Sequence, residues 1–312
     1  MGEQARGELV RKATPALAYF GDRLKRAERL DRYTAVRLGG PADYLVVARD
    51  RDDLRAALAL AHAAGLPLLV LGAGSNVLVD DQGFRGLVVV NRAQNVHFGT
   101  KDEPSVYAES GASLSTLARQ CIERGLSGMT WAVSVPGTIG GAVVNNAGAH
   151  GGDMAGVVQA VDVLPLCAPD AEPERWPTAA MAYAYRESRL KGARTHLVLG
   201  AALTLGRDDP EALREQARAF TERRKATQPP GASLGSIFKN PPGDYAGRLI
   251  EAAGLRGVRV GEVEVSQVHA NFFVNRGGAR TADYVALIEQ VRTAVYEKLG
   301  VMLELEVEII AA

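Results

Sequence analysis

Glycine is concentrated in one stretch of this 312-residue chain, and that concentration limits how the stretch can fold. Residues 72–156 hold 15 of the 34 glycines in 85 positions, just over a quarter of the chain. Glycine has no Cβ, so it lets the backbone turn sharply or come close to a ligand, but it weakens helix and strand interiors. We therefore expect turns that surround a bound group, with regular elements on either side.

The composition argues against several classes of protein. Lysine plus arginine total 36 and aspartate plus glutamate total 36, so the zero net charge disfavours a chain-wide nucleic-acid surface. Cys121 and Cys167 lack C-x-x-C spacing and the five histidines lack ligand spacing, so neither a disulfide framework nor a metal site is expected. The polar start has no apolar signal core, and no apolar run reaches the roughly 20 residues that span a bilayer. We expect a soluble cytoplasmic protein without membrane or nucleic-acid partners.

Hydrophobic periodicity predicts a chain that mixes strands and helices. Residues 1–20 are expected to form a loose or helical extension. Buried strands at 44–48 and 68–71 flank a helix that Asp50 or Asp52 caps and Gly65 ends. The later elements are expected as strands at 87–90, 157–164, 196–205 and 272–275, and as helices at 113–124, 210–226, 244–253 and 281–299.

Alternation of apolar and acidic residues predicts a further strand at 301–310. Because strand side chains alternate, Glu304, Glu306 and Glu308 would share one face. The opposite, apolar face would carry Leu303, Leu305, Val307 and Ile309. A solvated edge and a face that points into a cleft both fit this pattern.

Two glycine-rich turns are the main candidates for a binding site. Residues 72–76 (Gly-Ala-Gly-Ser-Asn) follow a predicted strand, where exposed backbone N–H groups can hold a phosphate, although an ordinary tight turn also fits. Val77 stands where a dinucleotide fingerprint needs its third glycine, which argues against that motif. In the second turn, residues 135–142 (Val-Pro-Gly-Thr-Ile-Gly-Gly-Ala), three glycines and a proline in seven residues predict neither helix nor regular strand. The apolar residues between these glycines disfavour a flexible linker, and two such turns suit a diphosphate joined to an aromatic ring system.

Residues 231–235 match the G-x-S-x-G pattern of hydrolases. A nucleophile elbow needs a strand before it and a helix after it. Prolines at 229, 230, 241 and 242 leave no room for either, so an esterase is disfavoured.

Six blocks of sequence carry a family resemblance. They are residues 71–86, 135–148, 185–188 (Tyr-Arg-Glu-Ser), 235–241 (Gly-Ser-Ile-Phe-Lys-Asn-Pro), 265–272 (Val-Ser-Gln-Val-His-Ala-Asn-Phe) and 303–307 (Leu-Glu-Leu-Glu-Val). In this order and spacing, from about Tyr33 to Ile310, they resemble the UDP-N-acetylenolpyruvoylglucosamine reductase (MurB) family. The resemblance implies an α+β fold, with an FAD-binding, vanillyl-alcohol-oxidase-like (PCMH-type) unit of two subdomains and a C-terminal α/β substrate domain. The implied ranges are 1–92 with the N-terminal extension, 93–226 and 227–312.

The resemblance also implies a reaction and a set of site residues. The reaction is NADPH-dependent reduction of UDP-N-acetylglucosamine enolpyruvate to UDP-N-acetylmuramate through non-covalent FAD, in peptidoglycan precursor synthesis, by a protein expected to be a monomer. Mapped by motif, Arg186 faces the substrate carboxylate, Ser236 protonates C2, and Glu306 is the catalytic glutamate, with Glu304 as its competitor. The implied substrate contacts are Tyr185, Lys239 and Asn240. The implied FAD contacts are Gly72, Ala73, Gly74, Ser75, Asn76, Val77, Pro136, Gly137, Thr138, Gly140, Gly141, Asn146, Ala147 and Gly148.

Some positions depart from the family pattern. Leu305 stands where proline is common, and His150 stands where tyrosine is common. The 49 residues between Arg186 and Ser236 contain no tyrosine, so the chain resembles the shorter subtype that lacks a tyrosine-bearing loop over the substrate. Two alternatives stay open: a different flavin oxidase with FAD tethered through a residue such as His150, and a sugar-nucleotide-binding protein without catalysis.

Overall fold

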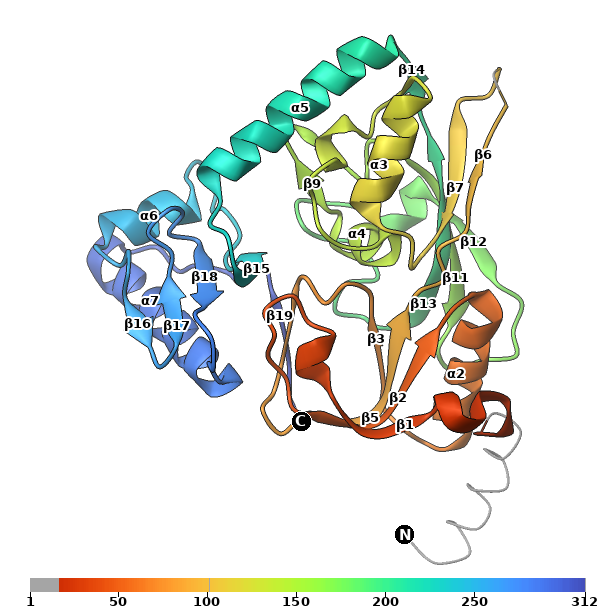
Figure 1. Cartoon of the computed structure of the whole chain (residues 1–312), viewed down its shortest axis with the longest axis horizontal. Coiled ribbons are helices and arrows are strands. Elements are labelled where there is room, and N and C mark those ends of the chain that lie inside the picture. Colours follow the sequence, from red (N-terminus) through yellow and green to blue (C-terminus); the bar gives the residue numbers. More distant parts are fainter. Residues whose placement is uncertain (1–16, 101, 312) are drawn as a thin grey trace, which may run out of the picture. The chain divides into compact units, whose positions relative to one another are not determined.

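The computed structural model describes residues 17–100 and 102–311, which form two compact units (Figure 1). The first unit gathers residues 17–26, 44–72 and 86–222, and the second gathers residues 27–43, 73–85 and 223–311. Both contain helices and strands, which confirms the predicted α+β class. Within these residues no helix is both long and apolar enough to cross a membrane. The extension expected at 1–20 lies outside the described residues up to position 16, and residues 17–20 are helical.

A four-stranded sheet has the order β1-β2-β5-β3, and β3 with the larger parts of β2 and β5 lies in the first unit. Asp50 caps α2 by accepting a hydrogen bond from the Asp53 amide, as predicted. The apolar face of α2, which includes Leu54 and Leu58, is buried against Val46 and neighbouring strand residues. The elements are β1 (Lys25–Arg29), β2 (Pro41–Ala48), α2 (Arg51–Ala63), β3 (Leu68–Leu71) and β5 (Phe84–Asn91), preceded by a 3-10 turn, η1 (Gly21–Arg23).

A five-stranded antiparallel sheet with the order β12-β11-β13-β7-β6 forms the larger part of the first unit. Its core joins apolar residues of α3, such as Leu117, to strand residues such as Val161 and Leu203. The sheet consists of β6 (Val96–Phe98), β7 (Ser105–Glu109), β11 (Val158–Pro165), β12 (Glu174–Pro177) and β13 (His196–Thr204). The remaining elements are α3 (Leu114–Glu123), β8 (Leu126–Ser127), η3 (Thr130–Ala132), α4 (Ile139–Asn145), β9 (Gly148–Ala149), β10 (Gly152–Asp153), η4 (Thr178–Met181), β14 (Gly206–Arg207) and α5 (Pro210–Thr227).

The helix α4 contradicts the prediction that residues 135–142 contain no helix. Its first turn packs directly on backbone: the Gly140 amide donates to the Ser110 carbonyl oxygen at 2.8 Å. A Cβ on Gly140 would lie 3.0 Å from the Ser110 Cβ, so the glycine permits this close packing. Burial of Ile139 and Val143 supplies the stabilisation that helix propensity does not.

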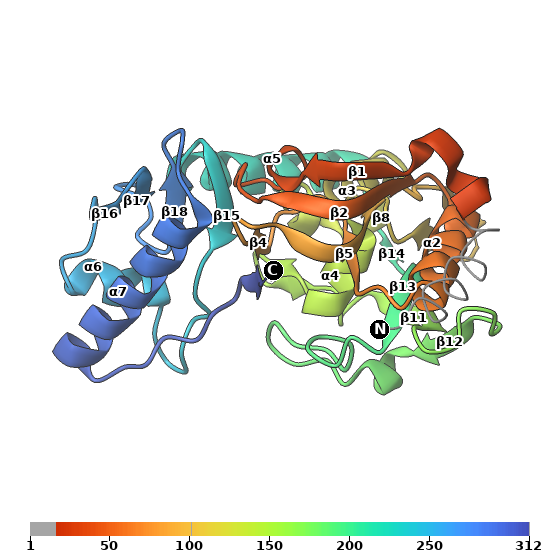
Figure 2. The ribbon, with the colours of Figure 1, turned by 90° about the horizontal axis from the view of Figure 1, so that it is seen from below.

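The second unit has its own antiparallel sheet, with the order β15-β18-β17-β16. The long helix α7 packs on it (Figure 2). Leu287, Ile288 and Val291 of α7 are buried in one core with Phe273. Gly300, at φ +71°, ends α7 as predicted. The elements are β15 (Ala232–Ser236), α6 (Ala246–Ala252), β16 (Arg259–Val260), β17 (Val263–Val265), β18 (Phe272–Asn275) and α7 (Thr281–Leu299).

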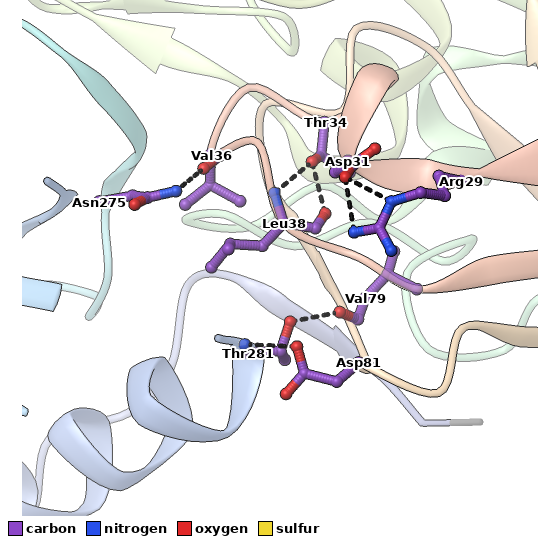
Figure 3. A network of polar contacts seen from close by, with 9 residues as sticks. All are labelled: Arg29, Asp31, Thr34, Val36, Leu38, Val79, Asp81, Asn275 and Thr281. Carbon is purple, nitrogen blue, oxygen red and sulfur yellow. Dashed lines mark hydrogen bonds and ion pairs between the residues drawn. The ribbon is translucent and has the colours of Figure 1, made fainter. Parts of the chain in front are cut away.

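Two segments from early in the chain complete the second unit. The strand β4 (Val77–Val79) pairs in parallel with β19 (Glu308–Ile310). Polar contacts tie the same early segments to β18 and α7 (Figure 3): the Asn275 side chain donates to the Val36 carbonyl oxygen at 2.9 Å, and the Thr281 hydroxyl donates to the Val79 carbonyl oxygen at 2.7 Å. A 3-10 turn, η2 (Leu30–Arg32), opens the first of these segments. This division into two units does not test the predicted domain ranges 1–92, 93–226 and 227–312, which stay a prediction.

The strand predicted at 301–310 is shorter, and its alternation is interrupted. Leu303 and Val307 are buried as expected, but Ile309 is 38% exposed and Ile310 is buried. The chain changes partners here: the Glu306 amide donates to the Ile237 carbonyl oxygen, and the Glu308 amide donates to that of Asn76. Because the two partner segments differ, one continuous face cannot extend over all ten residues.

Asp53 carries a buried ion pair of the first unit. Its side chain is 2% exposed and accepts two hydrogen bonds from the Arg23 guanidinium, at 2.8 and 2.9 Å, and one from the Arg49 amide at 2.8 Å. Burial alone would raise the pKa of Asp53, but the hydrogen bonds from Arg23 and Arg49 outweigh it, so the pKa is lowered.

We predict that Asp53→Asn lowers the free energy of unfolding at pH 7 by about 2–3 kcal/mol, because it leaves the partly buried Arg23 without its counter-charge. A lowered folded-state pKa contributes stability above the unfolded value of about 3.9 and loses it as the pH falls through the folded value. Urea unfolding should therefore show the gap at pH 7 and a smaller gap at pH 3. The exposed neighbour Asp52→Asn is the control, and an equal loss in both variants would contradict the prediction.

Candidate active site

The two glycine turns meet in the first unit. A Cβ on Gly72 would lie 2.2 Å from Oγ1 of Thr138, so only glycine lets the backbone approach that side chain. The Arg92 guanidinium donates to the Gly72 carbonyl oxygen at 3.0 Å and holds the chain where it leaves β3. The structure thus places Gly72 of the first predicted cofactor turn against Thr138 of the second.

The other residues of the first turn, 73–76, and the following Val77 belong to the second unit. Gly74 has φ +60°, and a Cβ there would lie 2.3 Å from the Tyr33 carbonyl oxygen. The Asn76 side chain donates to the Glu306 carbonyl oxygen at 3.1 Å, so this turn is attached to the segment of the predicted catalytic glutamate. Val77 begins a strand, which agrees with the argument against a dinucleotide fingerprint.

Buried polar atoms near the second turn indicate what it can hold. Ser134 Oγ, Trp131 Nε1 and Tyr183 OH are buried and have no hydrogen-bond partner among the described residues. Leaving such a group unpaired costs about 1–3 kcal/mol, so a polar ligand that supplies a partner is favoured there. Burial, helped by nearby Asp153, raises the pKa of Tyr183, which keeps its hydroxyl protonated and able to donate. Unpaired donors beside glycine backbone fit a large cofactor that combines polar groups with an aromatic ring, as FAD does.

The Tyr-Arg-Glu-Ser block is fixed to the second turn within the first unit. It forms a tight turn in which Ala184 and Glu187 exchange backbone hydrogen bonds. The Asn146 side chain donates to the Ala184 carbonyl oxygen at 2.9 Å, and the Ser188 hydroxyl donates to that of Val144 at 2.6 Å. These two bonds link the block to the C-terminal end of α4 and set where its side chains project.

Arg186 lies at that turn with its guanidinium beside the glycine backbone. One Nη donates to the Gly148 carbonyl oxygen at 2.7 Å, and the guanidinium lies 5.2 Å from the ring centroid of Tyr185. The φ of Arg186 is +57°, a left-handed conformation that is uncommon for residues other than glycine. The Lys191 ammonium donates to the Arg186 carbonyl oxygen at 2.9 Å. A permanent cation is therefore held next to Gly148, one of the predicted cofactor positions.

Ser236 ends the edge strand β15 of the second unit. It is paired with Phe272, and the pairing is irregular between Ser233 and Ser236, where Gly235 has φ +78°. Residues 232–235 are thus strand, with no elbow between a strand and a helix, which contradicts the hydrolase reading of 231–235.

The segment after Ser236 runs antiparallel to the glutamate segment. Phe238 and Leu305 form an isolated bridge, and on either side of it the Glu306 amide donates to the Ile237 carbonyl oxygen at 2.8 Å and the Lys239 amide to that of Glu304 at 2.8 Å. The predicted residues Ser236, Lys239, Glu304 and Glu306 are therefore brought together in one unit. Asn240 accepts a hydrogen bond from the Ala246 amide at 3.1 Å, which ties it to the start of α6.

Asn271 is a structural member of this region that no single motif pointed out. Its side chain is 2% exposed and binds both main-chain groups of Phe238, accepting from the amide at 3.0 Å and donating to the carbonyl oxygen at 2.8 Å. Its place in the block 265–272 was the only signal in the sequence. The described residues contain no group of three histidine, cysteine or acidic side chains that could hold a metal ion.

Comparison with known proteins gives two family models. The FAD binding domain model matches residues 42–165, and the model of the C-terminal domain of UDP-N-acetylenolpyruvoylglucosamine reductase matches residues 226–310. The first covers the residues of the second glycine turn, and the second covers those of the Ser236 and Glu306 segments. The predicted FAD-binding fold, followed by a C-terminal domain of this reductase type, is thereby confirmed.

Relatives match over nearly the whole chain. The chain is 47% identical over 290 residues to UDP-N-acetylenolpyruvoylglucosamine reductase 2 of Symbiobacterium thermophilum, which covers 92% of each protein. It is 44% identical over 292 residues to the reductase of Chloroflexus aggregans, covering 92% of this chain and 97% of that one. The crystal structure of UDP-N-acetylenolpyruvylglucosamine reductase (MurB) from Thermus caldophilus matches with a TM-score of 0.78 and 34% identity, over 92% of this chain and 99% of that one. On its motifs, its fold and these relatives, the chain belongs to the UDP-N-acetylenolpyruvoylglucosamine reductase (MurB) family.

Proposed function

We propose that this chain reduces UDP-N-acetylglucosamine enolpyruvate to UDP-N-acetylmuramate, a precursor of peptidoglycan, with NADPH as the electron donor. Held by the two glycine turns, FAD would supply the hydride transfer of this reaction, from NADPH to C3 of the enolpyruvyl group. The observation that carries the proposal is the Arg186 guanidinium, held at 2.7 Å on the Gly148 carbonyl oxygen of the second glycine turn. A fixed cation beside the predicted cofactor turn is what this reduction needs.

The chemistry explains why such a cation is needed. An enol ether is a poor hydride acceptor, because the negative charge that develops at C2 spreads only into the adjacent carboxylate. Hydrogen-bond donors and charges that already point at this developing charge lower the free energy of the transition state, because they need not reorient during the reaction. We assign Arg186 to the substrate carboxylate, with Tyr185 beside it as a substrate contact.

The second unit supplies the proton and the remaining contacts. We assign the Ser236 hydroxyl as the acid that protonates C2 and Glu306 as the catalytic carboxylate that acts with it. Lys239 and Asn240, which follow Ser236 on the same segment, are assigned to the substrate. Support comes from the main-chain pairing of residues 237–239 with 304–306, which brings the two segments that carry these residues side by side.

The glycine turns are assigned to FAD. Residues 72–77 would hold the diphosphate through backbone N–H groups. Residues 136–141 and 146–148 would lie along the cofactor, at places where larger side chains would keep the backbone too far from it. Non-covalent binding is favoured because the His150 ring, the one tether considered, is stacked on Phe220 with centroids 4.2 Å apart and planes 5° apart. The predicted ranges 1–92 and 93–226 would then be the FAD subdomains, and 227–312 the substrate domain.

We further propose that the protein works as a cytoplasmic monomer. Light scattering on the FAD-loaded protein should give a mass near that of one 33.1 kDa chain. A mass twice as large, unchanged on dilution, would contradict the monomer.

We predict that Ser236→Ala separates the two halves of the reaction. Loss of a positioned acid typically slows proton transfer by about 10²–10⁴-fold, so reoxidation of the reduced flavin by the enolpyruvyl substrate should slow at least 100-fold. Reduction of the flavin by NADPH should stay within twofold of the wild-type rate, measured by anaerobic stopped-flow absorbance.

Ser233→Ala, on the same strand, is the matched control and should leave both rates unchanged. Equal impairment of both half-reactions by Ser236→Ala, or of neither, would refute the assigned role. A wild-type protein that NADPH reduces but the substrate does not reoxidise would overturn the proposed substrate.

We predict that Gly72→Ala reduces FAD binding at least tenfold. The added methyl group would sit 2.2 Å from the Thr138 hydroxyl oxygen and push the two turns apart. Equilibrium titration of FAD into stripped protein measures the effect. Gly156→Ala, whose Cβ meets nothing closer than 3.7 Å, is the control.

The double variant Gly72→Ala, Thr138→Ala removes the clashing hydroxyl and should recover part of the affinity. If Gly72→Ala binds FAD as the wild type does, the contact between the turns does not shape the cofactor site.

A further inference from the structure

Glu304 and Lys239 form an unequal ion pair in the second unit. The Lys239 side chain is 9% exposed, whereas the Glu304 side chain is 72% exposed, and Nζ lies 2.6 Å from Oε1. An exposed carboxylate has little stabilising value in itself, because solvent screens it. Its effect on the buried partner is larger, since a long lysine side chain otherwise samples many rotamers.

The backbone explains why these two side chains meet. The bridge between Phe238 and Leu305 places Lys239 opposite Glu304, joined by the hydrogen bond from the Lys239 amide at 2.8 Å. Asn271 holds both main-chain groups of Phe238, so the lysine stem starts from a rigid base. The stem is thus fixed at its root by Asn271 and at its tip by Glu304.

We propose that Glu304 is a positioning residue that orients the Lys239 ammonium toward the anionic groups of the substrate, its diphosphate or its carboxylate. The inference rests on the proposed function, and it removes Glu304 as a competitor for the catalytic role of Glu306. Oε1 of Glu304 is already bonded to the Lys239 ammonium, so this oxygen is occupied and not available to a reacting group. An ammonium that is ordered before binding loses less side-chain entropy when the substrate arrives, so it strengthens ground-state binding.

The test is the kinetics of Glu304→Gln in the FAD-loaded, full-length protein. The KM for UDP-N-acetylglucosamine enolpyruvate should rise about five- to tenfold, with kcat within twofold of the wild-type value. The reason is that the lost contact stabilises the bound substrate and the transition state equally, so the barrier between them does not change. Flavin reduction by NADPH should not change. Glu297→Gln, an exposed carboxylate on α7, is the matched control for removing one surface charge and should leave KM unchanged.

A double-mutant cycle decides whether Glu304 acts through Lys239. If it does, Glu304→Gln has no further effect on KM in a Lys239→Met background. Effects that multiply would overturn the inference, as would a 100-fold loss of kcat at unchanged KM, which would make Glu304 catalytic. If the wild type turns over the substrate and Glu304→Gln has the same KM, only this inference is refuted. A wild type without turnover refutes the proposed function and this inference together.

Discussion

The parallel pairing of β4 with β19 is the constraint on which the second unit depends. The strand β4 follows directly on the first glycine turn, and β19 follows directly on the segment that carries Glu304 and Glu306. The pairing of these two short strands therefore positions both the turn and the glutamate segment. Asn76 completes it, because its side chain binds the Glu306 carbonyl oxygen while its own carbonyl oxygen accepts from the Glu308 amide. A slip of one residue in this register would break both bonds and turn Glu306 to the other side of the chain. A turn assigned to the cofactor and a residue assigned to catalysis therefore share one support.

Close backbone approach explains the glycine content better than flexibility does. Gly72 against Thr138 and Gly74 against Tyr33 leave less space than a Cβ needs, and a Cβ on Gly140 would lie tightly against Ser110, at 3.0 Å. In a chain with only 6% aromatic residues, such contacts let strands and turns pack without large side chains between them.

Elements with strong periodicity could be predicted from the sequence, and those held by distant contacts could not. Thr281–Leu299 and Phe272–Asn275 agree with prediction to the residue, because caps and apolar spacing are local signals. The helix Ile139–Asn145 was missed because its stability comes from Ser110 and a buried core rather than from propensity. For the site, the resemblance supplied the residue types. It did not supply the pairing of Lys239 with Glu304, since 65 positions separate the two.

The assembly of the second unit from separated segments bears on how the chain folds. Asn76 and Glu306 are 230 positions apart, so contacts within this unit close very long loops, a topology associated with slow folding. During synthesis, the segment 73–85 leaves the ribosome long before β19 exists, and within the described structure β4 has no other sheet partner. The first unit can condense meanwhile, since residues 44–72 and 86–222 precede that event. Catalytic competence would then arise in a single late step, when the last strand docks, and partly made chains would hold an exposed strand edge without activity.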